Sequence, residues 1–169
     1  MRMSSDAVGQ DGYHLLREMG SIGAENACSA LTRLTGKTVR TIKCEAIALD
    51  VENASRVLGA PDKVSVATAT NVEAELSGIM LFIMGEEFAA RLLEAIWDQP
   101  FSLPLSLERE DVIAIKQVSN AVCASYIAPL GEMLGMSAKL SPANLYCDNA
   151  RALMNLRCVR MSGRRKGLI

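Results

Sequence analysis

Aromatic residues, histidine and net charge are all scarce in this sequence. Aromatic residues make up 4% of the 169 residues although half of the chain is apolar, so we expect an aliphatic core that includes many of the nine methionines. The formal net charge is −1, and we therefore expect no general electrostatic attraction to nucleic acid or to anionic lipid. The longest apolar run, residues 79–84, is too short to span a membrane.

Metal-ligand spacings are also missing. No two cysteines form a Cys-x-x-Cys pair, and the chain has a single histidine. We therefore expect no metal site and no cofactor, and we interpret the cysteines as reduced thiols that pack as small apolar side chains. The first residues contain no apolar segment typical of a secretion signal, which favours a cytoplasmic location. The residues concerned are His14, Cys28, Cys44, Cys123, Cys147 and Cys158.

Apolar residues recur at steps of three and four in two long segments, which predicts two amphipathic helices. The first covers residues 13–34 and ends near Gly36, and the second begins at Ser106 as its N-cap and runs past Pro129. A shorter helix is expected over Glu86–Trp97. Segments rich in apolar and β-branched residues predict strands over 39–50, 64–72, 79–84, 143–148 and 152–161, with a hairpin turn at 76–78.

The two long helical segments correspond to each other when the chain is shifted by 99 residues. Two copies predict one pseudo-symmetric domain, residues 1–169, with halves of about 12–98 and 106–169, rather than a solenoid, which needs at least three units. The second copy is shorter, so we expect its last strand to be truncated or missing. The shift aligns Leu16 with Ile115, Met19 with Val118, Leu31 with Leu130, Gly36 with Gly135, Glu18 with Gln117 and Ser21 with Asn120.

The last two of these pairs carry the candidate chemistry. Residues three positions apart on a helix lie on one face, so their side chains project together. A carboxamide both donates and accepts hydrogen bonds and can orient a water molecule toward a phosphoryl group, while a carboxylate can pair with a lysine of a partner protein. Hydrolysis of a phosphate at such a site depends mostly on positioning.

The segments 16–27 and 116–126 resemble the two signature helices of the CheC-like chemotaxis phosphatase family, which includes CheC, CheX and FliY. The resemblance covers most of residues 12–161. It implies an α/β (α+β sandwich) fold in which two long helices lie on one face of a mostly antiparallel sheet of about six strands. It also implies hydrolysis of the aspartyl phosphate of the CheY response regulator, with CheD as a possible further partner. Any Mg²⁺ belongs to the regulator.

The family motif is a Glu followed three residues later by Asn, with a Pro some twenty residues beyond, and both copies here depart from it. The first keeps Glu18 but has Ser21 in place of Asn. The second keeps Asn120 and Pro142 but has Gln117 in place of Glu. Under the resemblance these four helix residues are catalytic and Pro142 binds the partner. We expect weak activity at the second copy and almost none at the first.

Two other interpretations remain open from the sequence. A non-catalytic adaptor on the same scaffold would bind a regulator, CheD or a flagellar switch component without turnover, and the incomplete motifs favour it. Alternatively, a degraded paralogue that lacks its last strand would expose a sheet edge and form dimers. The four polar residues are also compatible with an ordinary solvated helix face, as is His14, four residues before Glu18.

Overall fold

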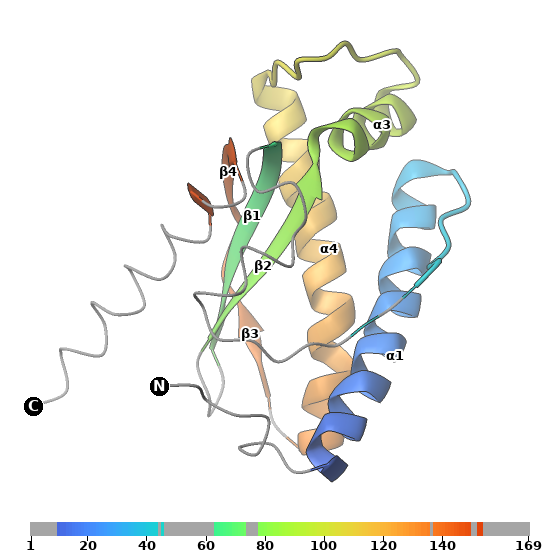
Figure 1. The fold of residues 1–169 in the computed structure, drawn as a ribbon, viewed down its shortest axis with the longest axis vertical. Helices are drawn as coiled ribbons and strands as arrows, with labels where there is room; N and C mark the ends of the chain where they lie inside the picture. The colour runs from blue at the N-terminus through green and yellow to red at the C-terminus, as the bar shows by residue number, and fades with distance from the viewer. Residues whose placement is uncertain are drawn as a thin grey trace, which may run out of the picture.

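The computed structural model describes residues 10–43, 45, 63–73, 78–135, 137–149 and 152–153. These residues form an α+β fold with three helices and an antiparallel sheet of four strands (Figure 1). In chain order the elements are α1 (Gln10–Thr35), β1 (Val64–Glu73), β2 (Gly78–Gly85), α3 (Glu86–Trp97), α4 (Arg109–Leu134), β3 (Lys139–Leu140) and β4 (Asn144–Asn149).

Strand β1 is the centre of the sheet. It pairs antiparallel with β2 along one edge, from Ser65 opposite Gly85 to Val72 opposite Gly78. On its other edge it pairs with β4 and, near its end, with the short β3. The predicted strands over 64–72, 79–84 and 143–148 are therefore confirmed, and β1 and β2 pair as the predicted hairpin requires. The described residues supply four strands of the about six expected, and the predicted last strand lies almost wholly outside them.

The strand prediction for 39–50 is wrong for residues 39–43, which form no strand. These residues instead follow the last turns of α1, because helix side chains satisfy their polar groups. The backbone N–H of Val39 donates to the Thr32 hydroxyl at 3.0 Å, and the Thr41 hydroxyl lies 3.1 Å from the Cys28 thiol. Residues 152 and 153 are helical rather than extended. The remaining residues of both predicted strands, except Glu45, lie outside the described part of the chain.

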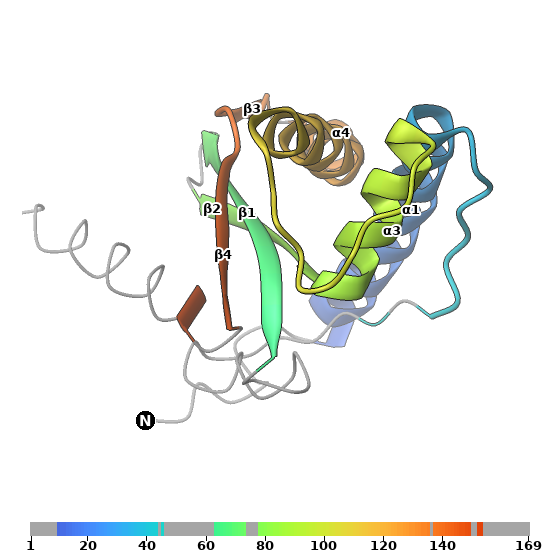
Figure 2. The same ribbon diagram turned by 90° about the horizontal axis from the view of Figure 1, so that it is seen from above.

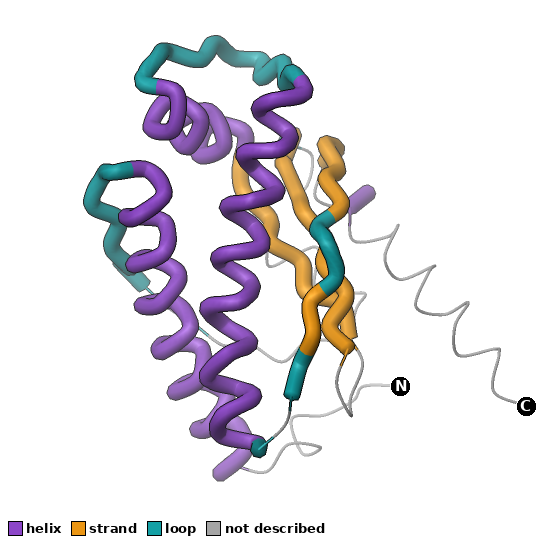
Figure 3. The backbone as a smooth tube through the Cα atoms, turned by 180° about the vertical axis from the view of Figure 1, so that it is seen from behind, coloured by secondary structure: helices purple, strands orange, loops and turns teal. Residues whose placement is uncertain are grey.

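The helices cover one side of the sheet (Figure 2). Helix α4 packs on β1, β2 and β4, and α1 runs antiparallel to α4 beside it, with α3 across one end (Figures 1 and 3). The core between them is aliphatic, as expected. Its buried members come from all three helices and from β1 and β2: Ala27, Leu31, Val66, Met84, Ala89, Leu92, Leu93, Ala114, Ile115, Val118 and Val122.

Close approach of α1 and α4 depends on a glycine. A Cβ at Gly23 would overlap the ring of Tyr126, so only glycine allows the ring to lie on the helix backbone. In the 99-residue correspondence Gly23 aligns with Val122, and Tyr126 aligns with Ala27. Val122 and Ala27 are both buried in the core cluster. The residues that correspond to this pair therefore both lie in the apolar core.

The N-cap of α4 is Glu108, not the predicted Ser106. The carboxylate of Glu108 accepts a hydrogen bond from the N–H of Asp111, and the Asp111 carboxylate accepts one from the N–H of Glu108 at 2.9 Å. This reciprocal capping box satisfies two N–H groups that a helix start leaves free. Asp111 also accepts a hydrogen bond from the indole N–H of Trp97 at 3.0 Å, a tertiary contact between α3 and α4.

Candidate functional site

The two polar pairs occupy equivalent places on equivalent helices. Glu18 and Ser21, the α1 pair, are the ninth and twelfth residues of a 26-residue helix. Gln117 and Asn120, the α4 pair, are the ninth and twelfth residues of another helix of 26 residues. All four side chains are exposed. Each pair therefore forms one patch on an outer helix face, as the spacing predicts.

None of these four side chains has a hydrogen bond or an ion pair within the described part of the chain. Their polar atoms are therefore available to water and to a partner. The carboxamide of Asn120 offers an oxygen that accepts and an NH₂ group that donates, so it can hold a water molecule in a defined direction. The Ser21 hydroxyl is shorter and lacks this planar donor–acceptor arrangement.

The α1 pair and the α4 pair are separate sites. Because the helices are antiparallel and Gly23 contacts Tyr126, Gln117 lies level with a point close to Thr32 on α1. That point is about 21 Å along the axis from Glu18, from a rise of about 1.5 Å per residue. The structure therefore does not bring the four residues together, and each pair must act alone.

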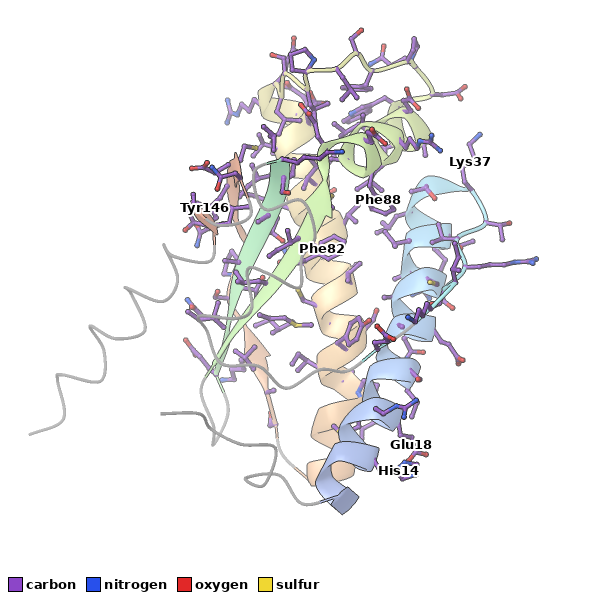
Figure 4. All side chains as sticks on the ribbon, in the orientation of Figure 1. His14, Glu18, Lys37, Phe82, Phe88 and Tyr146 are labelled. Atoms are coloured by element: carbon purple, nitrogen blue, oxygen red, sulfur yellow. The ribbon has the colours of Figure 1, made fainter. Side chains whose placement is uncertain are left out.

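The surroundings of the two pairs differ. On the α4 face Gln117 and Asn120 lie between exposed Ile113, one turn before them, and Ala124, one turn after. The equivalent positions on α1 are His14 and Glu25, both exposed, and Figure 4 shows His14 and Glu18 at the outer side of the first turns of α1. The α1 face thus carries acidic neighbours, whereas the α4 face carries Ile113 and has Lys116 one turn before Asn120.

Ile113 is a candidate functional residue that the sequence did not reveal. The residue is 46% exposed, as other large apolar residues such as Leu34 and Phe88 also are, so it is a candidate because it lies beside the α4 pair and not because of its exposure. The only signal in the sequence is an apolar residue four positions before Gln117, and that spacing is equally typical of a buried stripe.

Buried polar groups lie beneath the α4 pair, where the helix meets β1. The hydroxyls of Thr68 and Ser119 are hydrogen-bonded to each other, and the Ser119 oxygen lies 4.0 Å from the thiol of Cys123. All three residues are fully buried. Burial raises the pKa of the Cys123 thiol, and the nearby Ser119 and Thr70 hydroxyls only partly oppose this rise. The thiol is therefore an unreactive part of the core and not a nucleophile.

The remaining candidates have simpler surroundings. Pro142 is exposed in the connection between β3 and β4. The described cysteines, Cys28, Cys123 and Cys147, are free thiols. In the described ranges no three His, Cys, Asp or Glu residues are grouped to hold a metal ion. No helix of the described part has the length and apolar character needed to cross a membrane.

An open depression of about 500 Å³ lies between the end of α3 and the residues after α1, and none of the four candidate residues lines it. Its lining is Lys37, Arg91, Glu94, Ala95, Asp98, Gln99 and Pro100. The candidate sites are therefore exposed helix surfaces rather than clefts. Such a surface suits a macromolecular partner better than a small molecule, which usually binds in a concave, mostly apolar pocket.

Solved structures of chemotaxis proteins share this fold. The chain is similar to FliY of Thermotoga maritima, with a TM-score of 0.65 and 17% identity over 89% of this chain and 72% of that one. It is also similar to the chemotaxis protein CheX of Desulfovibrio desulfuricans, with a TM-score of 0.55 and 13% identity over 78% of this chain and 79% of that one. No protein-family model matches the sequence.

Proposed function

We propose that this protein is a CheC-type chemotaxis protein that hydrolyses the aspartyl phosphate of a CheY-type response regulator at the α4 pair. The fold shared with FliY and CheX supports the class of protein. The observation that carries the proposal is that Gln117 and Asn120 project from one exposed face of α4, without intramolecular partners in the described structure.

Each residue of the α4 pair has its own part in this reaction. Asn120 holds the attacking water in line with the phosphorus of the phosphoaspartate, and Gln117 hydrogen-bonds a lysine of the regulator. The regulator supplies its own Mg²⁺, which neutralises charge on the phosphoryl oxygens. A neutral carboxamide in place of a carboxylate makes this docking bond about half as strong, so the activity is low.

The α1 pair contributes little turnover in this proposal. Glu18 retains the charge that pairs with a lysine, but the short hydroxyl of Ser21 does not orient the water. The α1 face therefore binds a regulator without accelerating hydrolysis. CheD is proposed as a further partner only on the family resemblance.

A second candidate function is a non-catalytic adaptor for a response regulator, CheD or a flagellar switch component. The observation in its favour is that each pair lacks one member of the Glu and Asn combination.

Decay of a purified, phosphorylated CheY-type regulator from the same organism separates the two functions. Faster decay in the presence of the protein, lost in Asn120→Ala, supports the phosphatase. Unchanged decay together with measurable binding to the beryllofluoride-activated regulator supports the adaptor. If the protein neither accelerates the decay nor binds the regulator, both proposed functions are contradicted.

A further inference from the structure

We infer that Thr68 and Ser119 are positioning residues of the α4 site: the buried hydrogen bond between their hydroxyls fixes the rotation of α4 on the sheet, and with it the direction of Gln117 and Asn120. This inference rests on the proposed phosphatase function. Neither residue touches the regulator in this scheme, because both are fully buried. Their effect passes through the helix to its exposed face.

The hydrogen bond joins the centre of the sheet to the turn of α4 that carries the site. Thr68 lies in the middle of β1, the strand paired on both edges, so its position is fixed by backbone bonds to β2 and β4. Ser119 directly precedes Asn120. The Thr68 and Ser119 oxygens are hydrogen-bonded to each other and both residues are 0% exposed.

Close packing of aliphatic side chains limits the rotation of α4, and the hydrogen bond between Thr68 and Ser119 limits it further. Burial of aliphatic side chains has no preferred direction, whereas a hydrogen bond has a narrow range of distance and angle. A roll of about 20° moves an atom about 6 Å from the helix axis by about 2 Å. A misplacement of about 1 Å can reduce a reaction about a hundredfold. A directional bond one residue from Asn120 therefore controls a catalytically important distance.

Helix α1 lacks the equivalent groups. The 99-residue correspondence places Gly20 at the position of Ser119 and Ala24 at that of Cys123, and neither carries a polar side-chain atom. No side-chain hydrogen bond joins α1 to a strand among the described residues. Among the described residues, the polar connection to the sheet is thus found under α4, the helix that kept the carboxamide, and not under α1.

Thr70 is a matched control on the same strand. It lies two residues after Thr68, so it faces the same side of the sheet, and it is also fully buried. Its hydroxyl is near the Cys123 thiol but forms no well-formed hydrogen bond in the described structure. Thr70→Val and Thr68→Val therefore each replace a fully buried hydroxyl on the same face of β1 with a methyl group, and only Thr68→Val removes the hydrogen-bond partner of Ser119.

The test measures kcat and KM for the phosphorylated regulator in Thr68→Val, Ser119→Ala, the double variant and Thr70→Val. We expect kcat to fall about tenfold in both single variants, with a smaller rise in KM because Gln117 turns with the helix, and we expect kcat to fall no further in the double variant. Thr68→Ser, which keeps the hydroxyl, is expected to recover kcat to within twofold. Thr70→Val is expected to leave both constants unchanged. Thermal unfolding of each variant shows that it is folded.

A purely structural role gives a different result. It predicts that Thr68→Val and Ser119→Ala lower the melting temperature while kcat stays at the wild-type value, and this outcome would overturn the inference. An equal loss of kcat in Thr70→Val would also overturn it, because that variant leaves the hydrogen bond in place.

A second readout separates this inference from the proposed function. Nuclear magnetic resonance of the free protein follows the side-chain amide groups of Gln117 and Asn120. We expect these signals to shift in Thr68→Val but not in Thr70→Val, whether or not the wild type has activity. If the wild type does not accelerate decay, the proposed function fails while the structural part of the inference is still tested. Unshifted signals in Thr68→Val would refute the inference itself.

Discussion

Helices α1 and α4 have the same length, the same position for their polar pairs and the same exposure of those pairs, yet they differ in chemistry. Helix α1 keeps a carboxylate with a second carboxylate, Glu25, on the same face, and α4 keeps a carboxamide beside Ile113 and Lys116. The two helices therefore share one geometry but offer different groups, and in the proposed function the first binds charge while the second orients water.

The helices also differ in how they are held. Helix α4 packs on the sheet and is hydrogen-bonded to β1 through Ser119, whereas α1 packs mainly on α4 and α3. A group that must orient one water molecule needs a fixed support, and a group that only attracts a lysine does not, because charge attraction acts over a longer range. The better-supported helix is the one that carries Asn120.

The largest effect is expected from removal of the Asn120 carboxamide, which tests the difference between the α1 and α4 pairs. We expect Asn120→Ala to lower the rate of regulator dephosphorylation about a hundredfold, which is about 2.7 kcal/mol in transition-state free energy. Ser21→Ala, the matched change on α1, should alter the rate less than twofold. Equal losses in the two variants would show that the sites are equivalent and that α1 also catalyses. Phosphorylated-regulator decay measures both.

Breaking the contact between the helices should affect stability. We expect Gly23→Ala to lower the free energy of unfolding by up to about 2 kcal/mol, because overpacking costs about 1–3 kcal/mol and the gain in helix propensity returns about 1 kcal/mol. The added methyl meets the ring of Tyr126. Gly85→Ala is the control, since nothing lies within 4 Å of a Cβ there. Urea unfolding compares the stability of the two variants with that of the wild type. A Gly23→Ala midpoint equal to that of the wild type would show that the Tyr126 ring moves aside without cost.

The α1 site can be completed by one substitution. In the Asn120→Ala background, we expect Ser21→Asn to raise dephosphorylation about tenfold, because it places a water-orienting amide three residues after Glu18. The effect should be smaller than the loss at α4, because α1 lacks the hydrogen bond to the sheet. Recovery to the full wild-type rate would argue against the importance of that support.

The α4 site can be completed in the same way. We expect Gln117→Glu to lower KM for the phosphorylated regulator about fivefold at low salt, because a charge-assisted bond replaces a neutral one. The gain should shrink at high ionic strength as exposed charges are screened. A lower kcat with unchanged KM would instead show that residue 117 acts on the water and not on the partner.

The smallest expected effect concerns Cys123. The ordinary pKa of a cysteine thiol is 9.0, and burial raises the pKa of Cys123 in the folded protein. The unfolded chain therefore loses this proton at a lower pH than the folded chain. The free energy of unfolding should fall as pH rises above about 9. In Cys123→Ala this part of the decline disappears, and an identical slope in the two proteins would contradict the burial of the thiol.

Much of the fold was predictable because its signals are local. Apolar periodicity located α1 and α4 within a few residues, and the three β-rich segments located β1, β2 and β4. The predictions failed where side chains from elsewhere in the chain determine the path of the backbone or the position of a helix end. Residues 39–43 follow α1 because Thr32 and Cys28 bond them. The N-cap of α4 is Glu108 because Glu108 and Asp111 form a capping box. The Asp111 carboxylate of this box also accepts a hydrogen bond from the indole N–H of Trp97.

By itself the sequence determined two corresponding long helices, the spacing of each polar pair and the departure of each pair from Glu and Asn, because all three depend on residues within a few turns of one helix. Only the tertiary structure decided that the pairs lie far apart on antiparallel helices. It also decided that Thr68 of β1 is hydrogen-bonded to Ser119 of α4, which lies 51 residues later in the chain. Contacts between such distant residues arise from the packing of whole elements, which no local pattern encodes.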